Sequence, residues 1–391
     1  MKAAVMTGRA LVALLSAAVL VVAGYGWATL KRVQGSVNTT DVISALSDIP
    51  NAPPAEDGAL DILLVGSDSR TDAQGRPLPD RVLRELRTEA TDTVNTDTVI
   101  VVRVPRNGGK AHAVSIPRDT YLPIPDHGEE KINSAYGLTR YYTMERLAAE
   151  GGHDLEERTK LGDQAGRRAL VQVVQDLTGV RVDHYAEVNL YGFYLLTQVV
   201  GGVEVCLNRA TSDPDSGANF RAGVQTVSGG DALAFVRQRK NIPNGDLGRI
   251  TRQQVFLKSA LSQLLSAGTL ADQGRMTGLL DAMSKSVVVD DKLDLATLAG
   301  QAQGLAGGNV EFTTIPVTGV GAVNERGQSI VTVDREQVRA FVAEVLGAKT
   351  PAPSPTATVP TTTSVGRFAG GGLVTLDGPR RALAQGPPCV D

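Results

Sequence analysis

The feature that constrains this chain most is an uncharged apolar run near its start, Ala10–Leu30. As a helix rising about 1.5 Å per residue, this run can cross a hydrocarbon core of roughly 30 Å. It therefore predicts a membrane anchor within residues 1–32. Lys2 and Arg9 precede the run and Lys31–Arg32 follows it, so the positive-inside rule favours a cytoplasmic N-terminus only slightly. The alternative is a cleaved secretory signal, whose apolar region is usually only about 7–15 residues long.

Composition and motifs argue against several classes of function for the chain beyond the apolar run. The formal net charge of −3 gives no general attraction to nucleic acid, so an anion site has to come from local clusters of arginine. The four histidines and two cysteines occur at no metal-ligand spacing, which argues against a zinc enzyme. Neither a Gly-x-Ser-x-Gly elbow nor a Walker phosphate loop occurs, which disfavours a serine hydrolase and a P-loop enzyme.

Changes in composition divide the chain. Residues 33–59 are polar and contain three prolines, as expected of a stalk between membrane and domain. Residues 60–347 are expected to form the folded domain. Residues 348–391 begin with a Pro/Ser/Thr-rich stretch that cannot bury enough apolar surface to fold, and they are expected to be a tail.

Apolar runs and helical stripes alternate along the domain. Strands are expected at Leu60–Val65, Thr98–Val104, Ala111–Ile116, Tyr185–Val188, Val203–Leu207 and Val310–Val317. Helices are expected at Arg167–Leu177, Leu190–Val199, Asp231–Val236, Gly248–Ser266 and Arg335–Leu346. Continuous rather than alternating apolarity indicates strands buried on both faces. The alternation predicts a three-layer α-β-α domain with a central mixed sheet.

Two acidic residues stand at the ends of expected strands. Asp68 lies in the turn Gly66–Arg70 directly after one strand, and Asp97 opens the next. If these strands are neighbours, both carboxylates meet at one edge of the sheet, where open α/β sheets place ligands. Oxygen-only ligation suits Mg²⁺ better than zinc. The alternative is that both residues merely cap a turn and a strand.

Arginine gathers in two further stretches. Arg118 follows Pro117 at a strand end, where its planar guanidinium can grip phosphate, although an ion pair with Asp119 is the alternative. The densest stretch holds Arg237 and Arg239, which can serve one ligand together only if the preceding helix ends near them. A solvated basic face, favoured by the helix dipole, is the alternative for this pair.

The helix that follows this pair carries a second set of polar residues. Arg249 and Gln253 share one face at i, i+4 spacing. Asp246, just before them, is a candidate base for an acceptor hydroxyl, with a helix N-cap as the alternative.

Together these stretches resemble the LytR-CpsA-Psr family, whose motifs occur here in order over roughly residues 60–265. The matching segments are Gly66–Arg70, Asp97–Thr98, Ser115–Asp119, Lys131–Tyr136, Asp183–Tyr185, Gly201–Val205, Ala232–Arg239 and Asp246–Gln254. Two features depart from the family pattern. Asn95 stands where the family commonly has arginine, and Thr139–Arg168 is longer than the minimal family connection.

The resemblance implies a phosphotransferase outside the cell membrane that moves a glycopolymer from a polyprenyl-diphosphate carrier to peptidoglycan. It implies that Asp68 and Asp97 hold Mg²⁺, with Mn²⁺ as the alternative ion. The residues expected around the diphosphate are Arg70, Arg118, Lys131, Arg237, Arg239, Arg249 and Gln253. The expected catalytic residues are Arg118, Arg237, Arg239, Asp246 and Arg249. Phosphoryl transfer is mostly positioning and charge neutralisation, so a metal and several arginine forks suit it.

Three expectations remain. The prenyl chain requires an apolar tunnel, for which Leu190–Val199 is a candidate wall. Cys206 and Cys389 are expected to form a disulfide, because both lie in a segment assigned to an oxidising exterior; two free thiols are the alternative. The same residues also suit a pyrophosphatase that uses water as acceptor, or a non-catalytic sensor of prenyl diphosphates.

Overall fold

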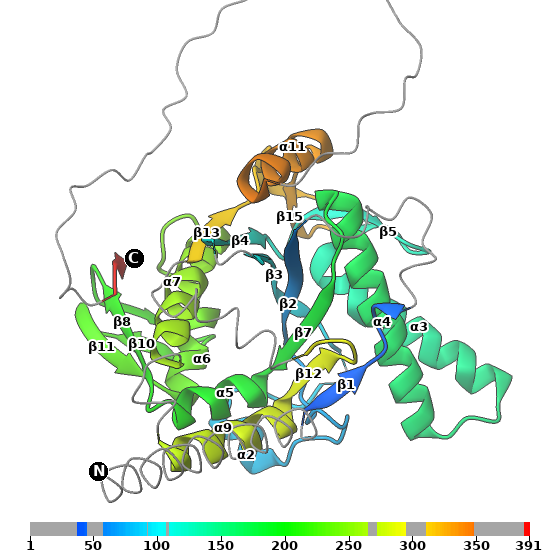
Figure 1. The fold of residues 1–391 in the computed structure, drawn as a ribbon, viewed down its shortest axis with the longest axis horizontal. Coiled ribbons are helices and arrows are strands. Elements are labelled where there is room, and N and C mark those ends of the chain that lie inside the picture. The colour runs from blue at the N-terminus through cyan, green and yellow to red at the C-terminus, as the bar shows by residue number, and fades with distance from the viewer. Residues whose placement is uncertain are drawn as a thin grey trace, which may run out of the picture.

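A seven-stranded mixed sheet forms the centre of the protein, with helices on both faces (Figure 1). The computed structural model describes residues 37–44, 58–91, 93–106, 109–264, 272–294, 310–347 and 387–391. The strand order is β1-β12-β7-β2-β3-β4-β13. These strands are β1 Asn38–Thr40, β2 Ala59–Ser67, β3 Thr96–Pro105, β4 Ala111–Ile116, β7 His184–Asn189, β12 Val287–Asp290 and β13 Val310–Thr314. The predicted α/β domain with a central mixed sheet is confirmed.

The two longest strands of the sheet, β2 and β3, are antiparallel neighbours. Gly66 lies opposite Thr98, and a β-carbon at Gly66 would stand only 3.0 Å from the Thr98 β-carbon. Glycine therefore permits this close pairing at the point where β2 ends. As a result, the turn after β2 and the start of β3 lie at the same edge of the sheet.

One face of the sheet is covered by α3 Ala135–Glu150, α4 Leu155–Thr178 and α11 Arg335–Leu346. Leu63 and Val101 from the sheet pack with Leu170, Val174 and Val338 from these helices in one buried cluster. Helix α4 is longer than the predicted Arg167–Leu177. It begins at Leu155 because the carboxylate of the preceding residue, Asp154, accepts a hydrogen bond from Glu157 N at 2.8 Å.

The other face is covered by α5 Leu190–Val199, α6 Gly229–Arg237, α7 Asp246–Leu264 and α9 Gln273–Ser286. Ile100 and Ala113 of the sheet pack against Leu257 and Leu261 of α7. Helices α5 and α11 have the predicted bounds, whereas α7 begins two residues before the predicted Gly248–Ser266, whose last two residues lie outside the described part of the chain. A short helix, α2 Asp80–Glu85, follows the turn after β2.

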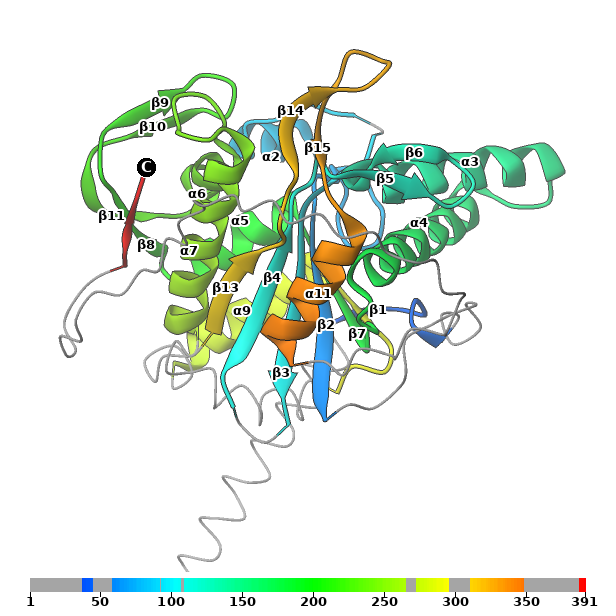
Figure 2. The same ribbon diagram turned by 90° about the horizontal axis from the view of Figure 1, so that it is seen from above.

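Several small sheets flank the central one. The predicted strand Val203–Leu207 exists as β8, but it lies in a separate sheet between β11 Gly223–Val227 and β16 Cys389–Val390. The predicted disulfide joins Cys206 of β8 to Cys389 of β16 and is confirmed. The hairpins are β5 Tyr121–Ile124 with β6 Gly128–Lys131, β9 Thr211–Asp213 with β10 Ala218–Phe220, and β14 Gly319–Val323 with β15 Ser329–Thr332. Figure 2 shows the three hairpins along one end of the central sheet.

The start of the domain differs from the prediction. Residues 33–59 were expected to be a stalk, yet β1 at Asn38–Thr40 pairs with β12 as the edge strand of the sheet. Val42, directly after β1, is fully buried in the main core, which explains why this segment packs on the domain. The predicted anchor Ala10–Leu30 and most of the predicted tail lie outside the described residues. None of the helices that the structure describes is long and apolar enough to cross a membrane.

Candidate functional site

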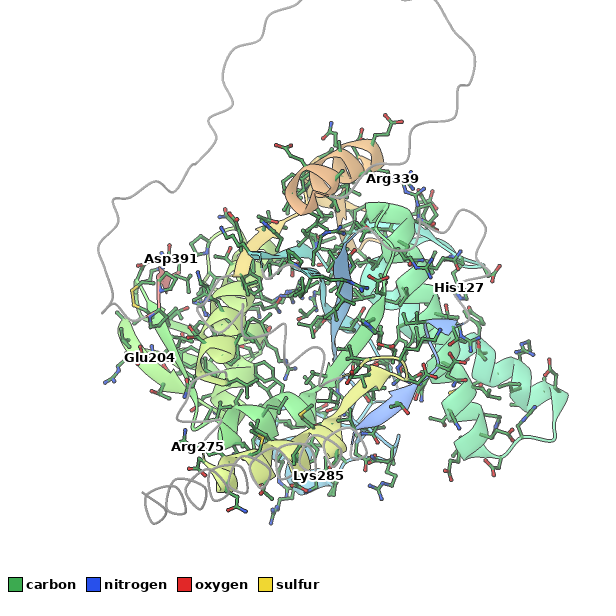
Figure 3. The ribbon with its side chains drawn as sticks, in the orientation of Figure 1. His127, Glu204, Arg275, Lys285, Arg339 and Asp391 are labelled. Atoms are coloured by element: carbon green, nitrogen blue, oxygen red, sulfur yellow. A yellow bond between two sulfur atoms is a disulfide. The ribbon has the colours of Figure 1, made fainter. Side chains whose placement is uncertain are left out.

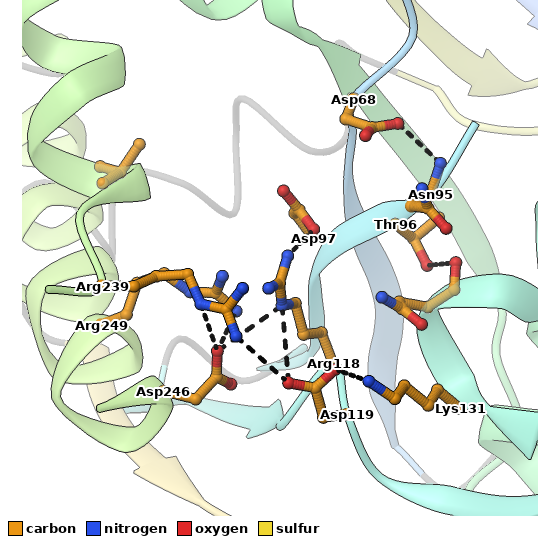
Figure 4. Close-up of polar contacts among 12 residues, drawn as sticks. Asp68, Asn95, Thr96, Asp97, Arg118, Asp119, Lys131, Arg239, Asp246 and Arg249 are labelled. Carbon is orange, nitrogen blue, oxygen red and sulfur yellow. Dashed lines mark hydrogen bonds and ion pairs between the residues drawn. The ribbon is translucent and has the colours of Figure 1, made fainter. Parts of the chain in front are cut away.

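Two carboxylates stand where β2 ends and β3 begins (Figure 4). Asp68 Oδ1 accepts a hydrogen bond from Asn95 N at 2.6 Å, and Asp68 Oδ2 lies 2.9 Å from Arg70 Nη1. Asp97 Oδ1 accepts a hydrogen bond from Arg118 Nη1 at 2.5 Å. Both acidic residues line the same cavity. The expectation that they meet at one edge of the sheet is therefore confirmed.

A network of alternating charges extends from Asp97 (Figure 4). Arg118 Nε lies 3.5 Å from Asp246 Oδ1 and 3.9 Å from Asp119 Oδ2. Arg249 Nη2 lies 2.7 Å from the same Asp246 oxygen. Both Arg118 and Asp119 are largely buried, so their contact is part of an internal network rather than a surface ion pair.

The network ends at two cations nearer the surface. Lys131 Nζ donates a hydrogen bond to Asp119 Oδ1 at 3.0 Å. Arg239 Nη2 lies 3.8 Å from Asp119 Oδ2, and Arg239 Nε lies 4.0 Å from Asp246 Oδ1. Arg239 is half exposed, with 52% of its side chain accessible. The structure thus brings the motifs of five separate chain segments into one cluster.

Helix α6 ends beside Arg237 and Arg239, which is the condition under which both can serve one ligand. Helix α6 ends at Arg237, and Gln238 has an extended backbone with φ −55° and ψ 134°. Arg237 lines the cavity, while Arg239 reaches the Asp119 and Asp246 carboxylates. The pair is therefore not a solvated face of a continuous helix.

Helix α7 contributes the most deeply buried cation of the site. Arg249 is 2% exposed and lines the cavity. Its Nη2 lies 2.7 Å from Asp246 Oδ1, whereas no acceptor within the described part of the chain meets its Nε. One turn on, Gln253 also lines the cavity and donates a hydrogen bond to Val236 O at 3.2 Å. A buried guanidinium with an unpaired donor at the wall of a cavity favours an anionic ligand.

The charges shift the acid–base equilibria of the site. Burial raises the pKa of Asp97, but the positive charges of Arg118 and Arg249 outweigh it and hold the pKa below its ordinary value. Burial lowers the pKa of Arg237 and of Arg249. Even so, guanidinium groups stay protonated near neutral pH. The site is thus an ionised carboxylate among buried guanidinium groups.

Behind the charges lies an apolar cavity of about 300 Å³. Its polar lining residues include Asp68, Asp97, Arg237, Arg249 and Gln253. Its apolar lining residues include Leu190, Phe193, Leu196, Val200, Phe256, Leu257, Leu261, Leu264 and Leu279. Helix α5 therefore forms one wall of an apolar cavity, and the presence of a prenyl chain in it stays a prediction. Along α7, at about 1.5 Å per residue, Leu261 lies roughly 18 Å from Arg249, so the cavity has a charged end and an apolar end.

Some features of the site were not predicted. Asp119 was expected only as an ion-pair partner of Arg118, yet it is buried and lies within 4 Å of three cations. Its position directly after Arg118 in the chain was the available signal. Asn95 holds Asp68 through its main-chain N–H, a contact that a side-chain pattern cannot reveal.

The N-cap alternative for Asp246 is not supported. Helix α7 begins at Asp246 itself, and no main-chain N–H of the described residues donates a hydrogen bond to either carboxylate oxygen. Its recorded partners are the guanidinium groups of Arg118, Arg239 and Arg249. Over the same part of the chain, no three His, Cys, Asp or Glu side chains are grouped so that they could hold a metal ion.

Comparisons with known proteins agree with the fold and the motifs. The model of the LytR_cpsA_psr family matches residues 28–345. The cell wall biosynthesis protein LcpA of Corynebacterium glutamicum is 48% identical over 88% of this chain, which spans 66% of the LcpA length. The polyisoprenyl-teichoic acid–peptidoglycan teichoic acid transferase TagU of Oceanobacillus iheyensis is 30% identical over 75% of this chain and 77% of its own length. The solved LytR-Csp2A-Psr enzyme from Actinomyces oris shares the fold, with a TM-score of 0.53 at 16% identity, and covers 79% of this chain and 95% of its own.

Proposed function

The chain belongs to the LytR-CpsA-Psr family, and on that premise we propose that it transfers a glycopolymer from a polyprenyl-diphosphate carrier to peptidoglycan. The names of two relatives support this proposal: one is a cell wall biosynthesis protein, and the other is a transferase of polyisoprenyl-linked teichoic acid to peptidoglycan. The observation that carries it is the cavity with cations at one end and aliphatic and aromatic side chains along the rest. Such a cavity suits an amphiphile with a phosphorylated head.

The residues at the charged end have distinct roles in this proposal. Arg237 and Arg249 neutralise the diphosphate, and Arg118 orients the phosphoryl group that is transferred. The acceptor hydroxyl attacks the phosphorus that carries the glycopolymer, and the bond from that phosphorus to the bridging oxygen breaks. Asp246 takes the hydroxyl proton, and polyprenyl phosphate leaves. With water as the attacking group, the same arrangement would act as a pyrophosphatase.

We propose that Mg²⁺ is bound at Asp68 and Asp97. Each carboxylate already faces a guanidinium group, Arg70 for Asp68 and Arg118 for Asp97, so the pair alone offers few free oxygens. Mg²⁺ prefers six oxygen ligands and keeps several waters. The residues therefore fit an ion that binds weakly until a diphosphate supplies further oxygens. Once bound, the ion would neutralise charge on the diphosphate.

Calorimetric titration of Mg²⁺, with and without farnesyl diphosphate, tests the metal proposal. Wild type should bind the ion much more tightly when the diphosphate is present, and Asp68→Asn and Asp97→Asn should each lose that enhancement. Mn²⁺ should replace Mg²⁺ in the same titration. Equal enhancement in both amide variants, or full transfer activity in excess chelator, would leave the two residues as structural caps.

Cavity filling tests the proposed donor site. Ala260 lines the cavity on α7, whereas Lys258 on the same helix is exposed. Ala260→Trp should weaken farnesyl diphosphate binding at least about tenfold, the equivalent of roughly 1.4 kcal/mol, while affinity for inorganic diphosphate changes little. Lys258→Trp is the matched control and should bind both ligands like wild type. If Ala260→Trp affected both ligands equally, or neither, the cavity would not hold the prenyl chain.

We also propose that the Ala10–Leu30 run anchors the chain in the cell membrane with the domain outside. Support comes from its length and from the location of peptidoglycan, the proposed acceptor. Protease added to intact protoplasts should digest the domain. Complete protection until the membrane is opened would place the domain in the cytoplasm instead.

A further inference from the structure

Gln238 separates Arg237 from Arg239 and is the residue that directly follows helix α6. Its side chain is 0% exposed, whereas its two neighbours reach the site. An extended residue directs its own side chain away from those of its neighbours. Burial of Gln238 on the inner side therefore turns both arginines outward, toward the diphosphate site.

The Gln238 side chain is fixed by contacts to three chain segments. Its Nε2 donates to Thr211 Oγ1 at 2.6 Å and to Lys240 O at 2.9 Å. Its Oε1 accepts a hydrogen bond from Arg252 Nη1 at 2.6 Å. Arg252, one turn from Arg249 on α7, does not line the cavity; it provides the only charged contact recorded for Gln238 among the described residues. Arg252 therefore helps to hold the residue between the two arginines, beside Asp213 Oδ2, which accepts hydrogen bonds from Arg239 N and Lys240 N at 3.0 and 3.3 Å.

Arg252 depends in turn on a distant part of the chain. It is 0% exposed, stacks 5.1 Å from the centre of the Phe235 ring, and donates a hydrogen bond from Nε to the main-chain oxygen of Asp391 at 2.7 Å. Burial lowers the pKa of Arg252 to about 10, an effect that Asp391 opposes. Without Asp391, a buried guanidinium would lose one of its two hydrogen-bond acceptors.

Asp391 directly follows β16, an edge strand of the three-stranded sheet β11-β8-β16 (Figure 3). Cys389 of β16 pairs with Cys206 of β8 in the ladder and is joined to it by the disulfide, across 183 residues of sequence. Val390 is buried in the core between β8 and α7, and its carbonyl oxygen accepts a hydrogen bond from Asn208 N at 2.9 Å. The disulfide therefore fixes the residue on which Arg252 relies.

We propose that β16 acts as a disulfide-tethered clamp that sets the geometry of the phosphate-binding arginines. The clamp acts through Asp391 on Arg252, through Arg252 on Gln238, and through Gln238 on Arg237 and Arg239. Gln238 and Arg252 are positioning residues rather than ligand contacts. This inference rests on the proposed diphosphate site. It predicts that the affinity of that site depends on a disulfide whose cysteines line no part of the cavity.

Two measurements test the clamp in the full-length protein: amide hydrogen exchange over residues 238–240, and calorimetric affinity for farnesyl diphosphate. The test variants are Arg252→Lys and the double variant Cys206→Ser/Cys389→Ser. Arg209→Gln is the matched control, because Arg209 also contacts Asp391, at 3.7 Å, but on the surface. Lysine keeps the positive charge but cannot bridge Asp391 and Gln238 as the guanidinium does.

Both test variants should exchange these amides at least about tenfold faster, and their affinity should fall at least about tenfold, as expected when one charge-assisted hydrogen bond is lost. Arg209→Gln should match wild type in both measurements. Wild-type exchange over residues 238–240 in both test variants would overturn the clamp. If Arg252→Lys also loosened β2 and α4, Gln238→Ala would decide the question, since it leaves the Arg252–Asp391 contact intact; unchanged exchange at residues 239–240 there would overturn the clamp.

The two measurements separate this inference from the proposed function. If wild type failed to bind farnesyl diphosphate, the donor site would be refuted, while the exchange data would still decide whether β16 positions the α6 end. If wild type bound the ligand and the variants bound it equally well, the site would stand and the clamp would be refuted.

Discussion

Replacement of Asp246 by asparagine tests the two roles proposed for this residue, charge neutralisation and proton acceptance. Its Oδ1 atom lies 2.7 Å from Arg249, 3.5 Å from Arg118 and 4.0 Å from Arg239. Asp246 therefore neutralises three guanidinium groups, and in the proposed reaction it also accepts the proton of the acceptor hydroxyl. Asparagine keeps the shape of the side chain but removes both the negative charge and the basic oxygen.

The geometry sets the size of the expected effects. Removal of one partner of a buried ion pair costs about 3–5 kcal/mol when a charge is left uncompensated. Here Asp119 remains near Arg118 and Arg239, so the free energy of unfolding should fall by less, about 1–3 kcal/mol. Loss of a general base typically lowers the rate about 10²–10⁴-fold. Affinity for the diphosphate should be kept or should rise, because the arginines lose an internal competitor.

Asp119→Asn is the matched control. It removes the same charge beside Arg118, Arg239 and Lys131, but it does not remove the proposed base. Transfer rate, farnesyl diphosphate affinity and urea unfolding should be measured for both variants. Asp246→Asn should lose turnover far more than Asp119→Asn at a similar loss of stability. Wild-type turnover in Asp246→Asn, or an equal loss in both variants, would refute the assignment of Asp246 as base.

Three further outcomes are expected. Arg239→Lys should lose most activity with little change in melting temperature, because lysine keeps the charge but not the bidentate geometry. Wild-type turnover in this variant would show that Arg239 is a solvated surface residue that does not bind the diphosphate. The pKa of Asp97 is depressed, so its ion pair with Arg118 stabilises the fold above the unfolded pKa near 4, and that contribution is lost as the pH falls through the lower folded value. The difference in unfolding free energy between wild type and Asp97→Asn should therefore shrink as the pH is lowered from about 5 through the folded pKa of Asp97. A difference that does not change with pH would contradict the ion pair. Thiol titration of the denatured, unreduced protein should detect neither Cys206 nor Cys389, whereas two titratable groups would exclude their disulfide.

Local sequence patterns were sufficient to locate the centre of the fold. β2, β3 and β4 are buried on both faces, which leaves a continuous apolar run, and their predicted bounds agree to within a few residues. Helix α3 was not predicted as a full helix, because it buries only three of its residues and shows little apolar periodicity. The predicted Cys206–Cys389 disulfide correctly joined the tail to β8, but the sequence did not reveal that β8 lies in a sheet separate from the central one.

The charged residues of the site could be identified from their motifs, but their partners could not. Arg249 and Arg252 stand one turn apart on α7 and look alike in sequence. In the structure, one lines the cavity and the other is buried against Phe235 and Asp391. The difference arises from tertiary packing, which the spacing of residues along one helix does not encode.

Transfer of a phosphoryl-linked glycopolymer by this protein can be measured directly. The direct measurement is to incubate the full-length protein in membranes with Mg²⁺, a radiolabelled polyprenyl-diphosphate-linked glycopolymer and peptidoglycan, and to follow the label. Transfer should leave label bound covalently to peptidoglycan through a phosphodiester, together with an equal amount of released polyprenyl phosphate. Released polymer phosphate with no label on peptidoglycan would identify a pyrophosphatase, and a donor that stays bound and intact would identify a sensor; either result would contradict the proposed transferase.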